Sequence, residues 1–312
     1  MFKLMFPGKK QRWGLALIAG GLILVVLGAL WMAVLFPSMS KLPCDFSATT
    51  VTEGTVTVLD TQTYMPMTYN VTVTREFETV DCVGDTAYIT EDVSFVDSDT
   101  GEAIPMLVSH SLMAVDRATK MFVPNAVDEY REGYWTTPAG VTKDDVFDVW
   151  VTGNPATVKS GYVSEEDFHG LHVMCRAAAT PEEGLIVPAT DTTPEMIVYA
   201  QYQSKCEPVS GAVVWATSTT KRTMMIPSPA DTSTLIEITV YEDQLTFTDE
   251  QTEKMIEDAK EYKSQIILYG TTMPWVIIIL GFLEMALGIW MSGIIKIIKY
   301  VINMKKNPPA TG

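Results

Sequence analysis

The side chains of this sequence that could do chemistry are few and widely spread. Two of its three histidines, His169 and His172, belong to the segment HGLH. Positions three apart on a strand point to opposite faces, so this pair is not expected to converge on a metal ion. The chain contains no nucleophile elbow, no HExxH segment and no phosphate-cradling glycine loop. We therefore predict that the protein is not an enzyme and has no catalytic residue, cofactor or metal site.

Four cysteines, Cys44, Cys82, Cys175 and Cys206, lie between the two long apolar runs of the chain. If this part of the chain is outside the cytoplasm, oxidation is possible and three pairings are open. We expect Cys44–Cys82 and Cys175–Cys206, because each pair joins segments that a sheet would make neighbours. Asn70 begins the sequon Asn-Val-Thr and is a glycosylation site if the host uses that chemistry.

Two apolar runs decide the class of protein. Residues 13–36 carry no charge, and residues 274–295 carry one, that of Glu284. Each run exceeds the roughly 20 residues that a helix needs to cross about 30 Å of hydrocarbon. The first is too long for the apolar core of a cleavable signal peptide, so we interpret it as a signal anchor. Lysines and Arg12 flank the runs at both ends of the chain, and the positive-inside rule then places both termini in the cytoplasm.

The segments between the runs have a pattern typical of β-strands. They are rich in Val, Thr and aromatic residues, and apolar and polar residues partly alternate along them. The predicted fold class is mainly β (α+β), with antiparallel sheets, between an N-terminal and a C-terminal transmembrane helix. We expect the plasma membrane as location, with the main domain outside. The segments are a basic cytoplasmic N-terminus (1–12), a transmembrane helix (13–36), a β-rich extracytoplasmic domain (37–247), a juxtamembrane helix (248–272), a second transmembrane helix (273–295) and a basic cytoplasmic tail (296–312).

Local signals refine this outline. Residues 124–170 are punctuated by Gly, Pro and acidic residues, which favours long surface excursions. Residues 248–270 are helical in pattern, and Thr248 and Gln251 have the spacing of a capping box. The net charge of −16 is concentrated in the middle of the chain, and it repels phosphate backbones. Nucleic acid is therefore not an expected partner.

Four segments follow the order of a known pattern. They are AVDRATK (114–120), GYWTTPAGVTKDDVFDVW (133–150), EEDFHGLHVMCR (165–176) and LTFTDEQTEKMIEDAKEY (245–262), the last ahead of an apolar span led by Pro274. In this layout the chain resembles the PorA-type family of envelope membrane proteins, best known from actinobacteria. It departs from the family pattern where Asp148 precedes Trp150 and where Val146-Phe147 replaces an aromatic pair.

The resemblance implies a role near the assembly or export of envelope lipoglycans. A membrane porin needs a closed barrel of about eight or more strands with a lipid-facing apolar stripe, whereas the strands here are acidic and Thr-rich. The resemblance also implies that Asp116 and Arg117 are structural residues, one of which pairs to hold the end of the sheet. We expect the protein to bind or hand on a lipid or lipoglycan, with membrane lipids and a lipoglycan as partners. The alternative is a non-catalytic scaffold subunit of a membrane complex, and a helical-oligomer channel is less favoured.

Four aromatic residues, Tyr134, Trp135, Phe147 and Trp150, are candidates for the ligand surface. Aromatic faces suit both sugars and lipid chains. The commoner role of such side chains is to fill or cover a core, and the sequence leaves both interpretations open.

The glycines of the two apolar runs are regularly spaced. Gly14, Gly21 and Gly28 recur every seven residues in the first run, and Gly281 and Gly288 repeat that spacing in the second. A period of seven keeps small residues on one helical stripe and lets two backbones approach closely. We predict that the two helices pack antiparallel along these stripes.

Glu284 lies about 15 Å beyond Pro274 at the helical rise, near the middle of the second span. An isolated ionised carboxylate there costs a few kcal/mol. The first span has no ionisable side chain to offer it. The carboxyl is therefore neutral, or its partner comes from another chain, either a second copy in a homo-oligomer or a partner membrane subunit. A neutral Glu284 with no role is the remaining alternative.

Overall fold

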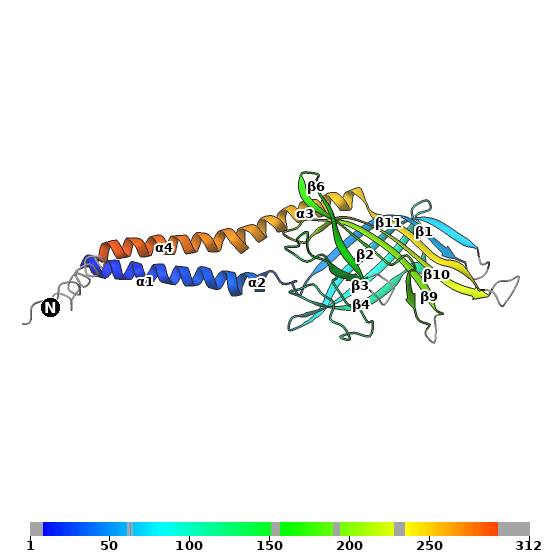
Figure 1. Cartoon of the computed structure of the whole chain (residues 1–312), viewed down its shortest axis with the longest axis horizontal. Helices are drawn as coiled ribbons and strands as arrows, with labels where there is room; N and C mark the ends of the chain where they lie inside the picture. Colours follow the sequence, from blue (N-terminus) through cyan, green and yellow to red (C-terminus); the bar gives the residue numbers. More distant parts are fainter. Residues whose placement is uncertain are drawn as a thin grey trace, which may run out of the picture. The chain divides into compact units, whose positions relative to one another are not determined.

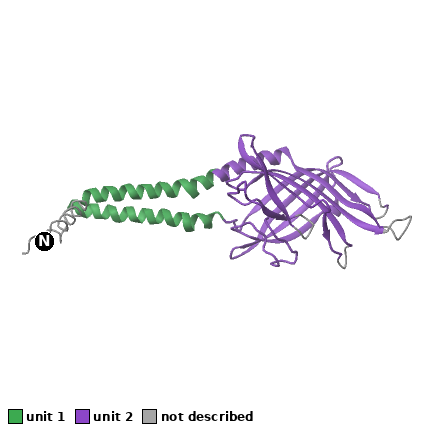
Figure 2. Cartoon of the chain, in the orientation of Figure 1, with its two compact units in different colours: residues 1–40, 264–312 green, residues 41–263 purple. Residues whose placement is uncertain are grey.

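The computed structural model of the chain describes residues 9–60, 63, 65–150, 157–189, 194–227 and 235–292. The chain divides into two compact units, residues 1–40 with 264–312 and residues 41–263 (Figure 2). Most of the basic segment expected at 1–12, and all of the one expected at 296–312, lie outside the described residues.

The first unit is formed by two helical segments. The N-terminal one contains α1 (Lys9–Leu30), the π-helical η2 (Trp31–Leu35) and α2 (Phe36–Met39). The C-terminal one contains the end of α3 (Asp249–Ile267), the π-helical η4 (Leu268–Thr272) and α4 (Met273–Ser292) (Figure 1). Both segments are long and apolar enough to cross a membrane. The long apolar helices predicted before and after the sheet domain are therefore confirmed.

Glycines bring the backbones of α1 and α4 into direct contact. Gly14, Gly21 and Gly28 are buried in α1, and Gly281 and Gly288 are buried in α4. A Cβ atom added to Gly281 would lie 2.6 Å from the Gly21 carbonyl oxygen, and one added to Gly288 would lie 2.6 Å from that of Gly14. Any larger residue would overlap backbone atoms of the other helix. The two helices therefore run antiparallel with the glycine stripes at their contact.

Aromatic residues lie at both ends of this helix pair. At one end the Trp31 indole N–H donates to the Tyr269 carbonyl oxygen at 2.8 Å. Tyr269 belongs to η4, which ends two residues before Pro274, and this proline has no N–H to donate to the preceding turn. At the other end the Lys10 ammonium lies 5.2 Å from the ring centre of Trp290. Aromatic and basic side chains in these places suit the two interfaces of a bilayer.

The second unit is built on a curled antiparallel sheet. Among the described residues ten strands form one path in the order β4-β3-β2-β1-β11-β10-β9-β7-β6-β5, and β8 pairs with β9 (Figure 1). The strands are β1 (Ser47–Leu59), β2 (Pro66–Val83), β3 (Thr86–Asp97), β4 (Ser109–Asp116), β5 (Phe147–Trp150), β6 (Thr157–Phe168), β7 (Leu171–Ala179), β8 (Leu185–Val187), β9 (Met196–Cys206), β10 (Val213–Pro227) and β11 (Leu235–Phe247), with the 3-10 turn η3 (Pro105–Leu107) before β4. The half-barrel confirms the predicted mainly β, antiparallel fold.

Alternation along the strands gives this sheet a core inside its curl. Val56, Val71, Val73 and Val93 point to the inner face and pack together with Leu245 of β11. Each of these side chains is almost completely buried. Full burial of a valine contributes about 1.5 kcal/mol or more, so this cluster is a main source of the unit's stability.

Helix α3 covers part of the opposite face of the sheet. Ile256 and Ala259 pack against Leu171 and Val173 of β7 and Val214 of β10. Thr248 caps the helix, since its hydroxyl accepts the Gln251 N–H at 3.1 Å. The predicted capping box is only half formed, because the Gln251 side chain instead accepts the Val51 N–H of β1 at 3.2 Å. This bond ties the start of α3 to the sheet.

The two edge strands of the half-barrel are joined by short extended segments. Phe122 bridges Val115 of β4, Met121 bridges Tyr134, and Tyr134 bridges Val149 of β5. The Phe122 N–H donates to the Gly133 carbonyl oxygen at 2.9 Å, and the Tyr134 N–H donates to that of Asp148 at 2.8 Å. Backbone groups that an open edge would expose are thereby satisfied.

The prediction that residues 124–170 form long surface loops is only partly right. They contain β5 and all of β6. Strand β6 is rich in acidic and small residues, and many of its side chains are exposed, so its alternation is weak. Pairing with β5 and β7 decides its conformation, and that pairing is invisible in the local pattern.

One of the two expected disulfides is present. Cys44 and Cys82 are joined, as predicted. The link closes a loop of 38 residues, which corresponds to about 4 kcal/mol of chain entropy. The expected Cys175–Cys206 bond is wrong, and both thiols are free. In the register of β7 and β9, Cys206 lies opposite Met174 and Cys175 lies opposite Lys205, so the two thiols point to opposite faces.

We predict that Gly21→Leu separates the two helices of the first unit. A leucine there overlaps the Gly281 backbone, and the overlap costs about 2 kcal/mol or more. The measurement is thiol crosslinking in membranes between Ile18→Cys and Met285→Cys, which lie at the glycine contact. The crosslink should form in the parent and be strongly reduced by Gly21→Leu.

The matched control is Ala16→Leu, on the exposed side of the same helix. It should leave the crosslink unchanged. Equal crosslinking in Gly21→Leu and Ala16→Leu would contradict the glycine contact.

Candidate functional site

A cleft of about 680 Å³ lies beside the segments that join the two sheet edges. Its lining comes from four stretches, within 121–124, 132–134, 138–141 and 145–148, together with Thr157. The cleft thus belongs entirely to the sheet unit and is formed by the connection between β4 and β6.

The lining combines apolar and aromatic surface with carboxylates. The Tyr134 and Phe147 rings are in edge contact, with their centres 5.4 Å apart. Val146 is 60% exposed and Met121 is 37% exposed, so apolar side chains are available to a ligand. Glu132, Asp145 and Asp148 supply the carboxylates. Such a lining suits apolar groups and sugar rings whose hydroxyls donate to carboxylates.

The four candidate aromatic residues divide between this cleft and the core. Tyr134 and Phe147 line the cleft. Trp135 and Trp150 pack against the core cluster that contains Ile89. Neighbours in an extended segment point to opposite faces, as do residues three apart, so Trp135 and Trp150 point away from Tyr134 and Phe147.

Arg131 holds one wall of the cleft. Its side chain is 9% exposed, and its Nη1 lies 3.1 Å from Oε2 of Glu91 in β3. The other oxygen of Glu91 lies 3.1 Å from Nη1 of Arg75 in β2. Arg131 also donates to the Ser111 hydroxyl at 2.8 Å. A buried carboxylate clamped by two arginines therefore fixes the loop that carries Glu132, Gly133 and Tyr134.

Arg176 holds the other wall. It is 1% exposed and projects from β7, and it donates to the carbonyl oxygens of Ser160, Thr142 and Asp145. Its guanidinium also lies 4.5 Å from the ring centre of Phe147. Burial lowers the pKa of Arg176, yet the backbone acceptors satisfy its donors. The 142–147 turn is thus tied to the strands below it.

The sequence analysis did not single out these arginines or Glu91. A signal existed for two of them. Residues two apart on a strand share a face. Glu91 therefore lies on the same face as Ile89 and Val93, and Arg176 on the same face as Met174 and Ala178, so the strand pattern places both charges on the buried face. Arg131 stands in a loop without periodicity, and only the tertiary structure brings it to Glu91.

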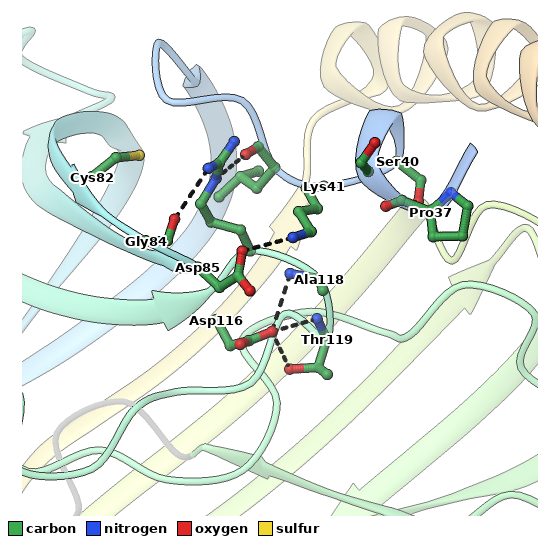
Figure 3. A network of polar contacts seen from close by, with 12 residues as sticks. Pro37, Ser40, Lys41, Cys82, Gly84, Asp85, Asp116, Ala118 and Thr119 are labelled. Carbon is green, nitrogen blue, oxygen red and sulfur yellow. Dashed lines mark hydrogen bonds and ion pairs between the residues drawn. The ribbon is translucent and has the colours of Figure 1, made fainter. Parts of the chain in front are cut away.

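Asp116 and Arg117 have separate roles instead of forming a pair. The Asp116 carboxylate accepts the N–H groups of Ala118 and Thr119 and the Thr119 hydroxyl, which shapes the turn after β4 (Figure 3). These bonds, chiefly that from the Thr119 N–H, lower the pKa of Asp116. Arg117 donates to the carbonyl oxygen of Leu42 at 2.6 Å and to that of Gly84 at 3.4 Å. It therefore does hold one end of the sheet.

The same end of the sheet fixes the start of the domain. The Lys41 ammonium lies 2.6 Å from the Asp85 carboxylate (Figure 3). The Leu42 N–H donates to the Arg117 carbonyl oxygen at 2.8 Å, and Cys44 is bonded to Cys82. Residues 41–44 are thus attached to the β2–β3 hairpin by an ion pair and a covalent bond, and to the turn after β4 by a backbone hydrogen bond.

Lys120 is an unusual member of this region. Its backbone φ is 64°, and its ammonium donates to the Arg117 carbonyl oxygen at 2.6 Å. Its own carbonyl oxygen accepts the Trp135 N–H at 3.0 Å. Burial, reinforced by the charge of Arg117, lowers the pKa of Lys120 to about 8.

The remaining candidate residues lie away from the cleft lining. Asn70 is exposed in β2 and its side chain donates to the Asp99 carboxylate at 2.8 Å. His169 occupies the β6–β7 turn with a φ of 52°, and His172 begins β7 with Nε2 3.7 Å from the Glu165 carboxylate. Glu284 lies in the first unit, next to Gly20.

The fold and the site together define a class of protein in which two membrane-capable helices accompany a curled antiparallel sheet domain with a cleft. A family model described as Porin PorA matches residues 13–290, and the chain belongs to this family. The match begins in α1 and ends in α4, so it includes both helices and the whole sheet. None of the curated proteins matches the sequence. Porin families are typically non-enzymatic, and this family and the two helices indicate the envelope membrane as the location.

We predict that Glu91→Gln destabilises the sheet unit by about 3 kcal/mol, because it removes the buried counter-charge of Arg131 and leaves it only the exposed Glu129. The measurement is urea unfolding of the full-length protein in detergent, combined with limited proteolysis of the 124–150 stretch.

The control is Glu129→Gln, which removes the second carboxylate bound to Arg131. Glu129 has a side chain 47% exposed, so its loss should cost less than about 1 kcal/mol. Equal losses in Glu91→Gln and Glu129→Gln would show that the buried carboxylate is not what holds the loop.

We predict that Lys120→Met flattens the pH dependence of stability between pH 8 and 10.5. The Lys120 pKa is about 8 in the folded state and close to its ordinary 10.5 when unfolded. The unfolded chain therefore binds more protons in this window, and stability rises as pH increases. Below pH 8 the protonated lysine carries its full cost, about 1–2 kcal/mol after allowance for its partial exposure. Unfolding free energies measured at pH 7.5 and pH 10 test this, and an unchanged pH dependence in Lys120→Met would contradict it.

Proposed function

We propose that this protein binds an amphiphile, a lipid or lipoglycan, at the outer face of the envelope membrane and hands it on. The observation that carries the proposal is the cleft, where Tyr134, Val146 and Met121 offer apolar and aromatic surface beside carboxylates. The cleft belongs to a domain that shares its chain with two membrane-capable helices.

The chemistry of the cleft lining favours the uncharged groups of such a ligand over its anionic groups. Glu132 and Asp148 accept hydrogen bonds from hydroxyls, and Tyr134 offers a ring face to a sugar or an acyl chain. The same carboxylates repel phosphate and other anions. The favoured ligand therefore presents uncharged, hydroxyl-rich groups together with apolar ones.

The orientation of the chain supports this role. Basic residues flank the two apolar runs at both ends of the sequence, and acidic residues dominate between the runs. By the positive-inside rule the termini are cytoplasmic and the sheet domain lies outside. The Cys44–Cys82 bond agrees with an oxidising compartment.

The second candidate is a non-catalytic scaffold subunit of a membrane complex. Glu284 favours it, because a carboxyl within an apolar span is a recurring sign of a contact with another membrane chain. A helical channel would need the same contact in a larger ring and has less support.

We predict that Tyr134→Ala reduces the amphiphile bound to the protein by several-fold, because it removes the largest ring of the cleft. The measurement is mass spectrometry of lipids and lipoglycans extracted from the full-length protein after gentle purification from its native membrane. Val146→Asp, which places a further charge in the cleft, should have a similar effect.

The matched control is Val163→Asp, at a valine of β6 that is 60% exposed, like Val146, and does not line the cleft. It should leave the bound material unchanged. If no lipid or lipoglycan is enriched on the parent protein, or if Val146→Asp and Val163→Asp lose it equally, the proposal fails and the scaffold role is favoured.

A further inference from the structure

Glu284 occupies a defined place on the helix pair of the first unit. Its carboxyl lies over Gly20 of α1, where an added Cβ would be 3.1 Å from Oε1 and 3.4 Å from Cδ. Gly20 stands outside the stripe of Gly14, Gly21 and Gly28 and is partly exposed, as is Glu284. The carboxyl is therefore at the edge of the α1–α4 contact and only partly covered. Figure 2 shows the unit to which both helices belong.

The surroundings of this carboxyl are apolar. Partly exposed residues on the same edge are Leu17 and Leu24 of α1 and Ile277 and Met291 of α4. Among the described residues none hydrogen-bonds the carboxyl of Glu284. Water cannot supply the missing partner within hydrocarbon, and an unsatisfied polar group there costs several kcal/mol. A hydrogen-bonding group from another chain at this depth would remove that cost.

We infer that this edge of the helix pair, containing Gly20 and Glu284, is where a second copy of the chain packs. A twofold axis along the membrane normal brings the same residue of both copies together at the same depth. Each copy then supplies a protonated carboxyl to the other, and the two neutral carboxyls pair through O–H···O hydrogen bonds without placing a net charge in the hydrocarbon. A neutral carboxyl is both a donor and an acceptor, so it is complementary to the same carboxyl of a second copy and needs no cationic partner helix.

Gly20 has a specific part in this contact. The absence of a Cβ leaves room for the carboxyl to lie against α1 and keeps the edge shallow, so that two helix pairs can approach closely. The remaining contact is aliphatic, through Leu17, Leu24 and Ile277, which pack in lipid by van der Waals contact.

The test is disulfide crosslinking between copies of the full-length protein in native membranes. Leu287→Cys lies one turn from Glu284 on the same side of α4, and it should give a crosslinked dimer. Phe282→Cys, which is 56% exposed on the other side of α4, should not. The unmodified protein, with only its free Cys175 and Cys206 thiols, sets the background.

Substitution of the carboxyl then identifies the partner. In the Leu287→Cys background, Glu284→Leu should reduce the dimer about ten-fold, whereas Glu284→Gln should retain it, because two amides can also hydrogen-bond each other. The crosslink between Ile18→Cys and Met285→Cys, measured in the same variants, reports that the helix pair itself is intact.

Four results would overturn the inference. Equal dimer from Leu287→Cys and Phe282→Cys would show random collision, and a dimer that survives Glu284→Leu would show that the carboxyl is not used. The Leu287→Cys crosslink could also be lost in Glu284→Gln as well as in Glu284→Leu, or the crosslinked product could contain only a protein of another mass. Either result would indicate that a basic helix of a different subunit binds Glu284.

Discussion

The sheet of this protein has two edges, and the need to satisfy them organises the rest of the domain. An open edge exposes a row of backbone donors and acceptors. Here Phe122 and Tyr134 carry hydrogen bonds from β4 across to β5, and the Glu91–Arg131 ion pair keeps the second of these segments in place. The cleft is a consequence of this closure, because the chain that joins the edges also forms the cleft walls.

The helix pair solves a different problem. In hydrocarbon there is little hydrophobic gain from bringing two apolar helices together, so close backbone packing must supply the attraction. The glycines of α1 and α4 allow that packing. Because Gly20 has no side chain, the Glu284 carboxyl can lie against α1 beside this contact. The result is a compact pair of helices with the Glu284 carboxyl at its edge.

The family name and the architecture describe different things. A porin that crosses the membrane with strands needs apolar side chains on the outside of a closed barrel. In this chain the strands belong to a curled sheet with many exposed polar side chains, and the segments able to cross a membrane are helices. Binding of an amphiphile in the cleft, and assembly through Glu284, both fit this architecture and do not require a strand-built pore.

The sequence by itself determined the two apolar helices, the stripes of Gly14 and Gly281 and the mainly β domain, because periodicity and composition are local properties. It also favoured the Cys44–Cys82 bond. Only the tertiary structure decided what depends on register: Cys175 and Cys206 lie on neighbouring strands but face apart, and Tyr134 and Trp135 divide between cleft and core. Strand β6 and the position of Arg131 were likewise beyond local patterns. Their conformations are set by partners distant in sequence, and a one-residue shift in pairing would reverse every side chain.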